Sequence, residues 1–140
     1  MNEVHPFDYI TLERTSCFGC CPVYKIKVYN SGLVEWEGID FVARKGKDRW
    51  HIAPEKAKKA AEIAEKIIVL LEEHERLIKV GEKELRIVTD CSSCEVAIKY
   101  KNGRVKSVEH YHGDMGAPKE LERLENEIDR VVGTEEWVGN

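Results

Sequence analysis

The sequence contains no glutamine and no long run of apolar residues. Its longest uninterrupted apolar stretch is Ile67 to Leu71, whereas a helix that spans a membrane needs about 20 such residues. We therefore expect no segment to cross a membrane. The first residues carry neither the basic start nor the apolar centre of a secretory signal. The expected location is the cytoplasm.

The signatures of several common enzyme classes are also missing. The chain has no glycine-rich phosphate loop, no Gly-x-Ser-x-Gly turn and no His-Glu-x-x-His helix. Its net charge of −4 argues against a general attraction to nucleic acid. The partner is unknown from the sequence, and a protein partner or a second copy of the chain stays open.

The lack of glutamine accompanies few asparagines and many glutamates and lysines. This balance is reported for hyperthermophile proteins, so we predict a heat-loving source. Cytosolic thiols usually stay reduced, but intracellular proteins of hyperthermophiles are an exception. The compartment therefore does not decide whether the cysteines of this chain bind metal or form disulfides.

Alternation of apolar and polar residues predicts a series of antiparallel strands. In Val23–Tyr29 the apolar positions fall on one face, and Asn30-Ser31-Gly32 then turns the chain into the next strand, as in a β-hairpin. The expected strands are 9–14, 23–29, 33–37, 49–52, 85–89, 96–100 and 105–111.

Two helices are expected, over residues of about 55–79 and about 118–132. Each follows a proline, Pro54 or Pro118, which suits the first position of a helix. Their apolar residues recur at spacings of three and four, which gives each helix one buried stripe. The predicted fold is α+β, with one face of an antiparallel sheet covered by both helices.

We expect residues 1–140 to form a single domain with two possible pseudo-repeats. The halves, about 8–80 and 84–132, each run through strands, a cysteine bend, an Asn/Gly turn and a helix. Cys17 and Cys91 lie 74 residues apart, as do Cys20 and Cys94. Two similar hairpins without duplication are the alternative.

Four of the five cysteines form two Cys-x-x-Cys pairs, Cys17/Cys20 and Cys91/Cys94. If the two bends meet, four thiolates could bind zinc in the tetrahedral geometry of structural sites. The separation of the pairs exceeds that of a compact zinc module. A disulfide between Cys17 and Cys21, which would close a small loop, and reduced thiols without a ligand are therefore alternatives.

A second set of candidate residues lies at the end of the strand 105–111. His110 and His112 are two residues apart, so both imidazoles could face one ion or substrate, and Asp114 could orient one of them. Arg14 and Asp90 each precede a cysteine bend, and we expect them to pair as a structural brace.

The stretch from Arg14 to Tyr24 resembles the signature R-x-x-C-F-G-x-C-P-x-Y of an uncharacterised bacterial and archaeal domain family, a domain of unknown function. Weaker likenesses at Thr89-Asp90 and His110-Tyr111 would extend the resemblance over most of the chain. The family pattern implies that Cys17 pairs with Cys21 rather than Cys20. It implies no established activity.

The sequence favours a non-catalytic, cysteine-stabilised binding or scaffold module that holds structural zinc or a disulfide. The alternative is an enzyme. It would be a thiol-disulfide oxidoreductase that uses Cys91 and Cys94, or a metal-dependent hydrolase that uses His110 and His112.

Overall fold

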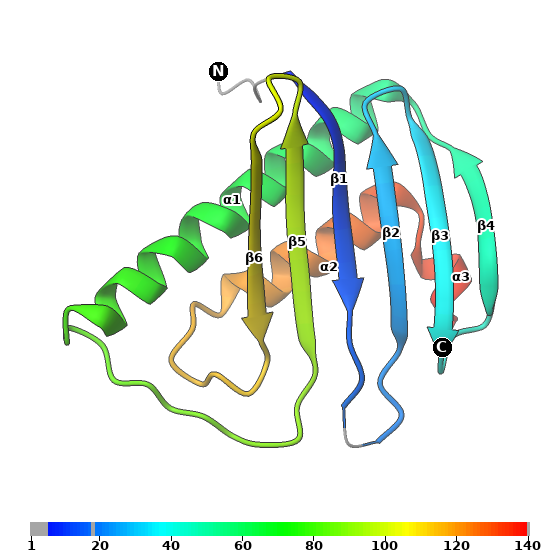
Figure 1. Ribbon diagram of the computed structural model, residues 1–140. Coiled ribbons are helices and arrows are strands. Elements are labelled where there is room, and N and C mark those ends of the chain that lie inside the picture. The colour runs from blue at the N-terminus through cyan, green and yellow to red at the C-terminus, as the bar shows by residue number, and fades with distance from the viewer. Residues whose placement is uncertain (1–5, 18, 140) are drawn as a thin grey trace.

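A six-stranded antiparallel sheet forms the centre of the protein, in the strand order β4-β3-β2-β1-β5-β6 (Figure 1). The computed structural model describes residues 6–17 and 19–139. Strand β1 lies between β2 and β5, so the later strands extend the sheet that the first hairpins begin. The strands are β1 (Phe7–Arg14), β2 (Val23–Tyr29), β3 (Leu33–Asp40), β4 (Gly46–His51), β5 (Ser93–Tyr100) and β6 (Val105–Tyr111).

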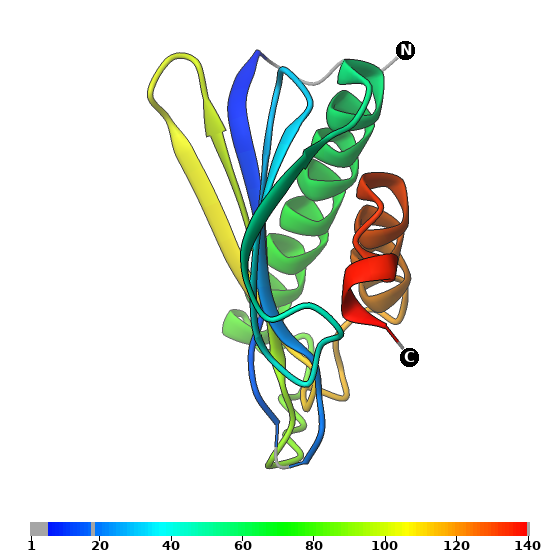
Figure 2. The ribbon, with the colours of Figure 1, turned by 90° about the vertical axis from the view of Figure 1, so that its right-hand side faces the viewer.

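Helices α1 (Pro54–Lys79) and α2 (Glu120–Val132) cover the same face of the sheet, and a short α3 (Glu135–Val138) follows them (Figure 2). The predicted α+β fold is therefore confirmed. Helix α1 begins at Pro54, as expected for a proline at the first helical position. Helix α2 ends at Gly133, whose φ of 88° suits a residue without a side chain. Among the described residues, no helix has the length and apolar character needed to cross a membrane.

The core lies between the sheet and the two helices. Every second residue of the central strands points into it, and the alanines of α1 let that helix approach the sheet closely. Indole rings extend the core toward the β4 edge, where Trp50 and Trp137 stack with ring centroids 4.6 Å apart. Trp50 also donates a hydrogen bond from Nε1 to the carbonyl of Val132, which fixes the end of α2.

The predicted strand at 85–89 is wrong. This segment forms only one isolated bridge, between Ile87 and Asp114. Its apolar side chains are about half exposed: Leu85, Ile87 and Val88. No other described part of the protein covers them, as it would cover the inner face of a strand in the sheet. The segment instead makes backbone hydrogen bonds to the loop after β6, from Val88 N to Gly113 O and from Met115 N to Arg86 O. The pseudo-repeats stay a prediction.

Like charges lie side by side on the sheet face that the helices leave open. Glu95 on β5 is paired with Glu13 on β1 and with Glu109 on β6. Although Glu95 is exposed, desolvation by the neighbouring side chains raises its pKa, and the charges of Glu13 and Glu109 raise it further. Ionised Glu95 therefore destabilises the native state.

We predict that Glu95→Gln raises the free energy of unfolding at pH 7 by about 0.5 kcal/mol. Because the native pKa is raised, the gain appears above the pH at which Glu95 ionises. It vanishes below the ordinary glutamate pKa of about 4.3, where both folded and unfolded states are protonated. Urea unfolding at pH 7 and pH 3.5 measures the difference. Glu37, which lies between Lys25 and Lys47, is the matched control. Its Gln variant should lose stability at pH 7, and a gain in both variants would contradict the argument.

Candidate metal centre on helix α2

Two carboxylates on the inner face of α2 organise this end of the protein. Glu125 is fully buried and Asp129 is nearly so. Residues four apart lie on the same face of a helix, so both side chains face the sheet. A buried carboxylate is costly unless it is paired and hydrogen-bonded. The sheet supplies a separate set of partners for each.

Glu125 lies between two imidazoles. His110 Nδ1 is 2.6 Å from Glu125 Oε2, and His112 Nε2 is 2.9 Å from Oε1. His110 belongs to β6 and His112 follows its end, so the two side chains project to the same face. The rings meet edge to face with centroids 4.7 Å apart. Each carboxylate oxygen thus faces one ring nitrogen.

The electrostatics of this cluster favour an ionised carboxylate. Burial by itself raises the pKa of Glu125, but the hydrogen bonds and charges of His110 and His112 outweigh it and hold the pKa below its ordinary value. The hydroxyl of Ser92 lies 3.0 Å from His112 Nδ1. Both nitrogens of His112 are therefore engaged. In metal sites, a hydrogen bond to the ring nitrogen that does not bind the ion fixes the orientation of a ligating histidine in the same way.

His110, His112 and Glu125 could hold a metal ion. One ligand atom from each lies within 4.8 Å of the others, and in the described part of the chain no other group of three metal-ligating side chains is this close. The sequence correctly brought His110 and His112 together but missed Glu125. One feature of the sequence could have identified Glu125. It is a charged residue on the buried apolar face of α2, which also carries Leu121, Leu124 and Ile128.

The expected role of Asp114 is wrong. Its carboxylate orients neither His110 nor His112 but lies 2.8 Å from Nε2 of His74, which is buried at the end of α1. Nζ of Lys83 lies 3.3 Å from the other ring nitrogen of His74. These contacts hold the loops after α1 and after β6 together.

The expected pairing of Arg14 with Asp90 is also wrong. Arg14 follows Leu12 on the helix-facing side of β1, so its guanidinium meets α2, and Nη2 lies 2.8 Å from Asp129 Oδ2. The hydroxyl of Tyr24 donates a 2.6 Å hydrogen bond to the same oxygen. Asp90 is exposed at a turn, with a φ of 66°. Burial raises the pKa of Asp129, and Arg14 and Tyr24 oppose that shift.

We predict that Asp129→Ala lowers the free energy of unfolding by roughly 3 kcal/mol, because it leaves the largely buried Arg14 guanidinium without its counter-charge. Denaturant unfolding measures the loss. The double variant Arg14→Met/Asp129→Leu removes both charges and should lose less than the single variant. A larger loss in the double variant would show that the pair acts by packing rather than by charge.

The cysteines occupy three different environments. Cys17 and Cys21 form a disulfide across the β1–β2 turn, and Phe18 within that turn lies outside the described residues. Cys20 is exposed, Cys91 partly exposed and Cys94 fully buried, all as free thiols. Because the sulfur of Cys17 is bonded to Cys21, the four-cysteine zinc site stays a prediction for a reduced chain.

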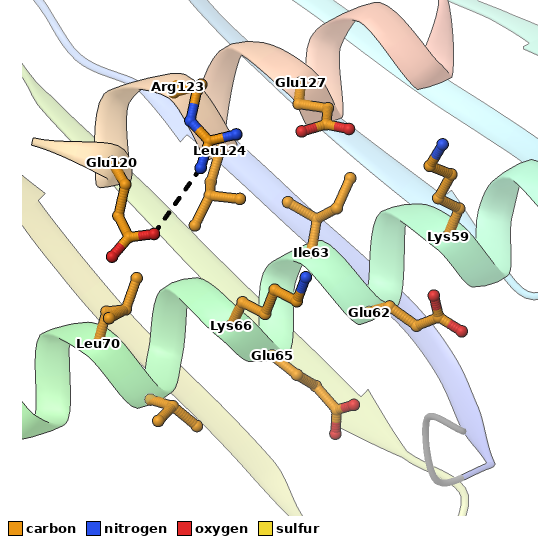
Figure 3. Close-up of a pocket in the computed structure, with 11 residues that line it drawn as sticks. Lys59, Glu62, Ile63, Glu65, Lys66, Leu70, Glu120, Arg123, Leu124 and Glu127 are labelled. Atoms are coloured by element: carbon orange, nitrogen blue, oxygen red, sulfur yellow. Dashed lines mark ion pairs between the residues drawn. The ribbon is translucent and has the colours of Figure 1, made fainter. Parts of the chain in front are cut away.

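A groove between α1 and α2 is separate from the metal-ligating cluster (Figure 3). Ile63 and Leu124 line it together with charged side chains of both signs. An ion pair of 3.7 Å between Arg123 and Glu120 runs along the α2 side of the groove. His110, His112 and Glu125 do not line this groove. The groove and the metal-ligating cluster are therefore two separate features of α2.

Comparison with protein families matches residues 8–132 to one family, described as Domain of unknown function (DUF6438). The chain belongs to this family. The match runs from β1 to the end of α2 and therefore includes both carboxylate clusters and all five cysteines. Comparison with curated proteins and with solved structures gave no match.

Proposed function

We propose that this protein is a non-catalytic, disulfide-stabilised binding module that holds a zinc ion at His110, His112 and Glu125. The observation that carries the proposal is the position of Glu125, a fully buried carboxylate with one imidazole at each oxygen. The ion would join the end of β6 to the middle of α2.

The donor set favours zinc over the harder divalent ions. Two imidazole nitrogens and one carboxylate oxygen are ligands that zinc accepts readily, whereas calcium and magnesium prefer oxygen alone. One negative charge from Glu125 offsets half of the charge of the ion. The Ser92 hydroxyl on His112 supplies the outer hydrogen bond that usually orients a ligating histidine.

Zinc fits after a small rearrangement of the cluster. Ligand atoms at about 2.1 Å from a tetrahedral ion lie roughly 3.4 Å from each other. The present contacts of 2.6 Å and 2.9 Å are made to different oxygens of Glu125. One oxygen of Glu125 and one nitrogen of each ring lie within 4.8 Å of one another, so these separations have to change by no more than about 1.4 Å. Side-chain rotation on β6 and α2 can provide this without a change of fold.

Limited access favours a structural role over catalysis. The side-chain exposure is 0% for Glu125, 8% for His110 and 21% for His112. One observation favours a metal-dependent hydrolase instead: three protein ligands leave a fourth position for water, as in catalytic zinc sites. His112 is the most exposed ligand, so water would reach the ion from its side.

Zinc titration of metal-stripped protein tests the proposal. We expect one ion per chain by calorimetry. Zinc at 100 times its dissociation constant should raise the free energy of unfolding by about 2.7 kcal/mol. Glu125→Gln should weaken binding at least tenfold, and Ser92→Ala should weaken it roughly tenfold or more through the loosened His112 ring.

His74→Gln is the matched control, because His74 is another buried histidine that faces a carboxylate, Asp114, outside the cluster. It should leave zinc binding unchanged. Equal loss in the His74 and Glu125 variants, or no binding by the unmodified protein, would contradict the proposal. Zinc-dependent ester hydrolysis that disappears in His112→Ala would favour the hydrolase.

A further inference from the structure

The pairing of β1 with β5 continues for one residue beyond the end of β1. The two strands pair in one unbroken antiparallel register, from Tyr9 opposite Lys99 to Arg14 opposite Cys94. The next pair, Thr15 and Ser93, is joined by a 3.0 Å hydrogen bond from Thr15 N to Ser93 O. Ser93 N in turn donates to Thr15 Oγ1 at 2.9 Å. The two chains therefore still run together where they leave the sheet.

If this register continued for two more residues, Cys17 would face Cys91. Both views of the ribbon show the loop after β1 and the loop before β5 side by side at the same end of the sheet (Figures 1 and 2). On the other side of β5, His112 N donates to Ser92 O at 2.9 Å, which holds the segment next to Cys91 in place. Directly opposed residues have Cβ atoms about 5 Å apart, so two opposed cysteines have to approach by roughly 1 Å to form a disulfide.

We propose that Cys91 is the attacking thiol for the Cys17–Cys21 disulfide, and that this end of the sheet is an intramolecular thiol-disulfide exchange site. Cys17 and Cys91 are both partly exposed, and Cys91 is a free thiol. A free thiol opposite a disulfide is the arrangement that exchange needs.

The reaction needs no outside oxidant or reductant. Cys91 loses its proton to solvent, and its thiolate attacks the sulfur of Cys17. The Cys17–Cys21 bond breaks, a Cys17–Cys91 bond forms, and Cys21 leaves as a thiolate that takes up a proton. One disulfide and one thiol are present before and after the step. Cys94 does not compete, because its side chain is fully buried in the core.

Exchange moves the cross-link from a local loop to a distant part of the chain. Cys17 and Cys21 are 4 residues apart in sequence, whereas Cys17 and Cys91 are 74 apart. A bridge that closes a longer loop restricts the unfolded chain more. The exchanged form would lock β1 to β5 beside Ser92, which contacts His112.

Peptide mapping of the unmodified protein tests the exchange. Oxidised protein is held at pH 8 with a trace of reduced glutathione, quenched with acid and alkylated. We expect a Cys17–Cys91 peptide to appear alongside the Cys17–Cys21 peptide. It should be lost in Cys91→Ser and kept in Cys20→Ser and Cys94→Ser. Complete alkylation of Cys91 with no linked peptide would overturn the proposal.

A second variant tests the geometry without relying on the equilibrium between the two forms. In Cys20→Ser/Cys21→Ser, oxidised glutathione should convert Cys17 and Cys91 into an internal disulfide and raise the melting temperature by several degrees over the reduced form. Adding Cys91→Ser should abolish both effects. A stable glutathione adduct on Cys17, with Cys91 free in a protein that still unfolds cooperatively, would show that the two sulfurs do not meet.

Discussion

Burial of two carboxylates on one helix is the constraint on which this end of the structure depends. Neither Glu125 nor Asp129 can be placed in the core alone, because an unpaired buried charge is strongly unfavourable. Each is stabilised by groups from the sheet, imidazoles for Glu125 and a guanidinium with a phenol for Asp129. The position of α2 along the sheet is therefore set by polar contacts as well as by apolar packing.

The two clusters connect α2 to different strands of the sheet, one at its edge and two at its centre. Helix α2 crosses behind the strands, so that Glu125 reaches residues of β6 and just beyond it, whereas Asp129 reaches β1 and β2 (Figure 1). The cysteine bends leave the same end of the sheet, next to Ser92 and Arg14. The proposed zinc site and the proposed exchange site are thus separate chemically but joined by β5 and by the Ser92–His112 contact.

Local patterns predicted the fold well. Alternation over Val23–Tyr29 and Val105–Tyr111 gave the observed bounds of β2 and β6, and the proline rule placed the start of α1 within one residue. The pattern at 85–89 failed because alternation predicts a strand only when one face is buried, and here the side chains face solvent.

The candidate site was only half predictable. The spacing of His110 and His112 follows from strand geometry, so the sequence identifies the pair. Their carboxylate comes from a helix 13 residues or more further along the chain, and the choice of Glu125 over the nearby Asp114 depends on how the helix packs. Likewise, Arg14 selects Asp129 rather than Asp90 because β1 turns that side chain toward α2. Tertiary packing decides such partners, and local sequence does not encode it.

The most direct measurement of the central claim is an anomalous difference map at the zinc absorption edge, from crystals grown with one equivalent of zinc. The account predicts one strong peak between His110, His112 and Glu125, with lengthened contacts from the two imidazoles to the carboxylate. No peak at that position, or a peak at the cysteines with the imidazoles still hydrogen-bonded to Glu125, would contradict it.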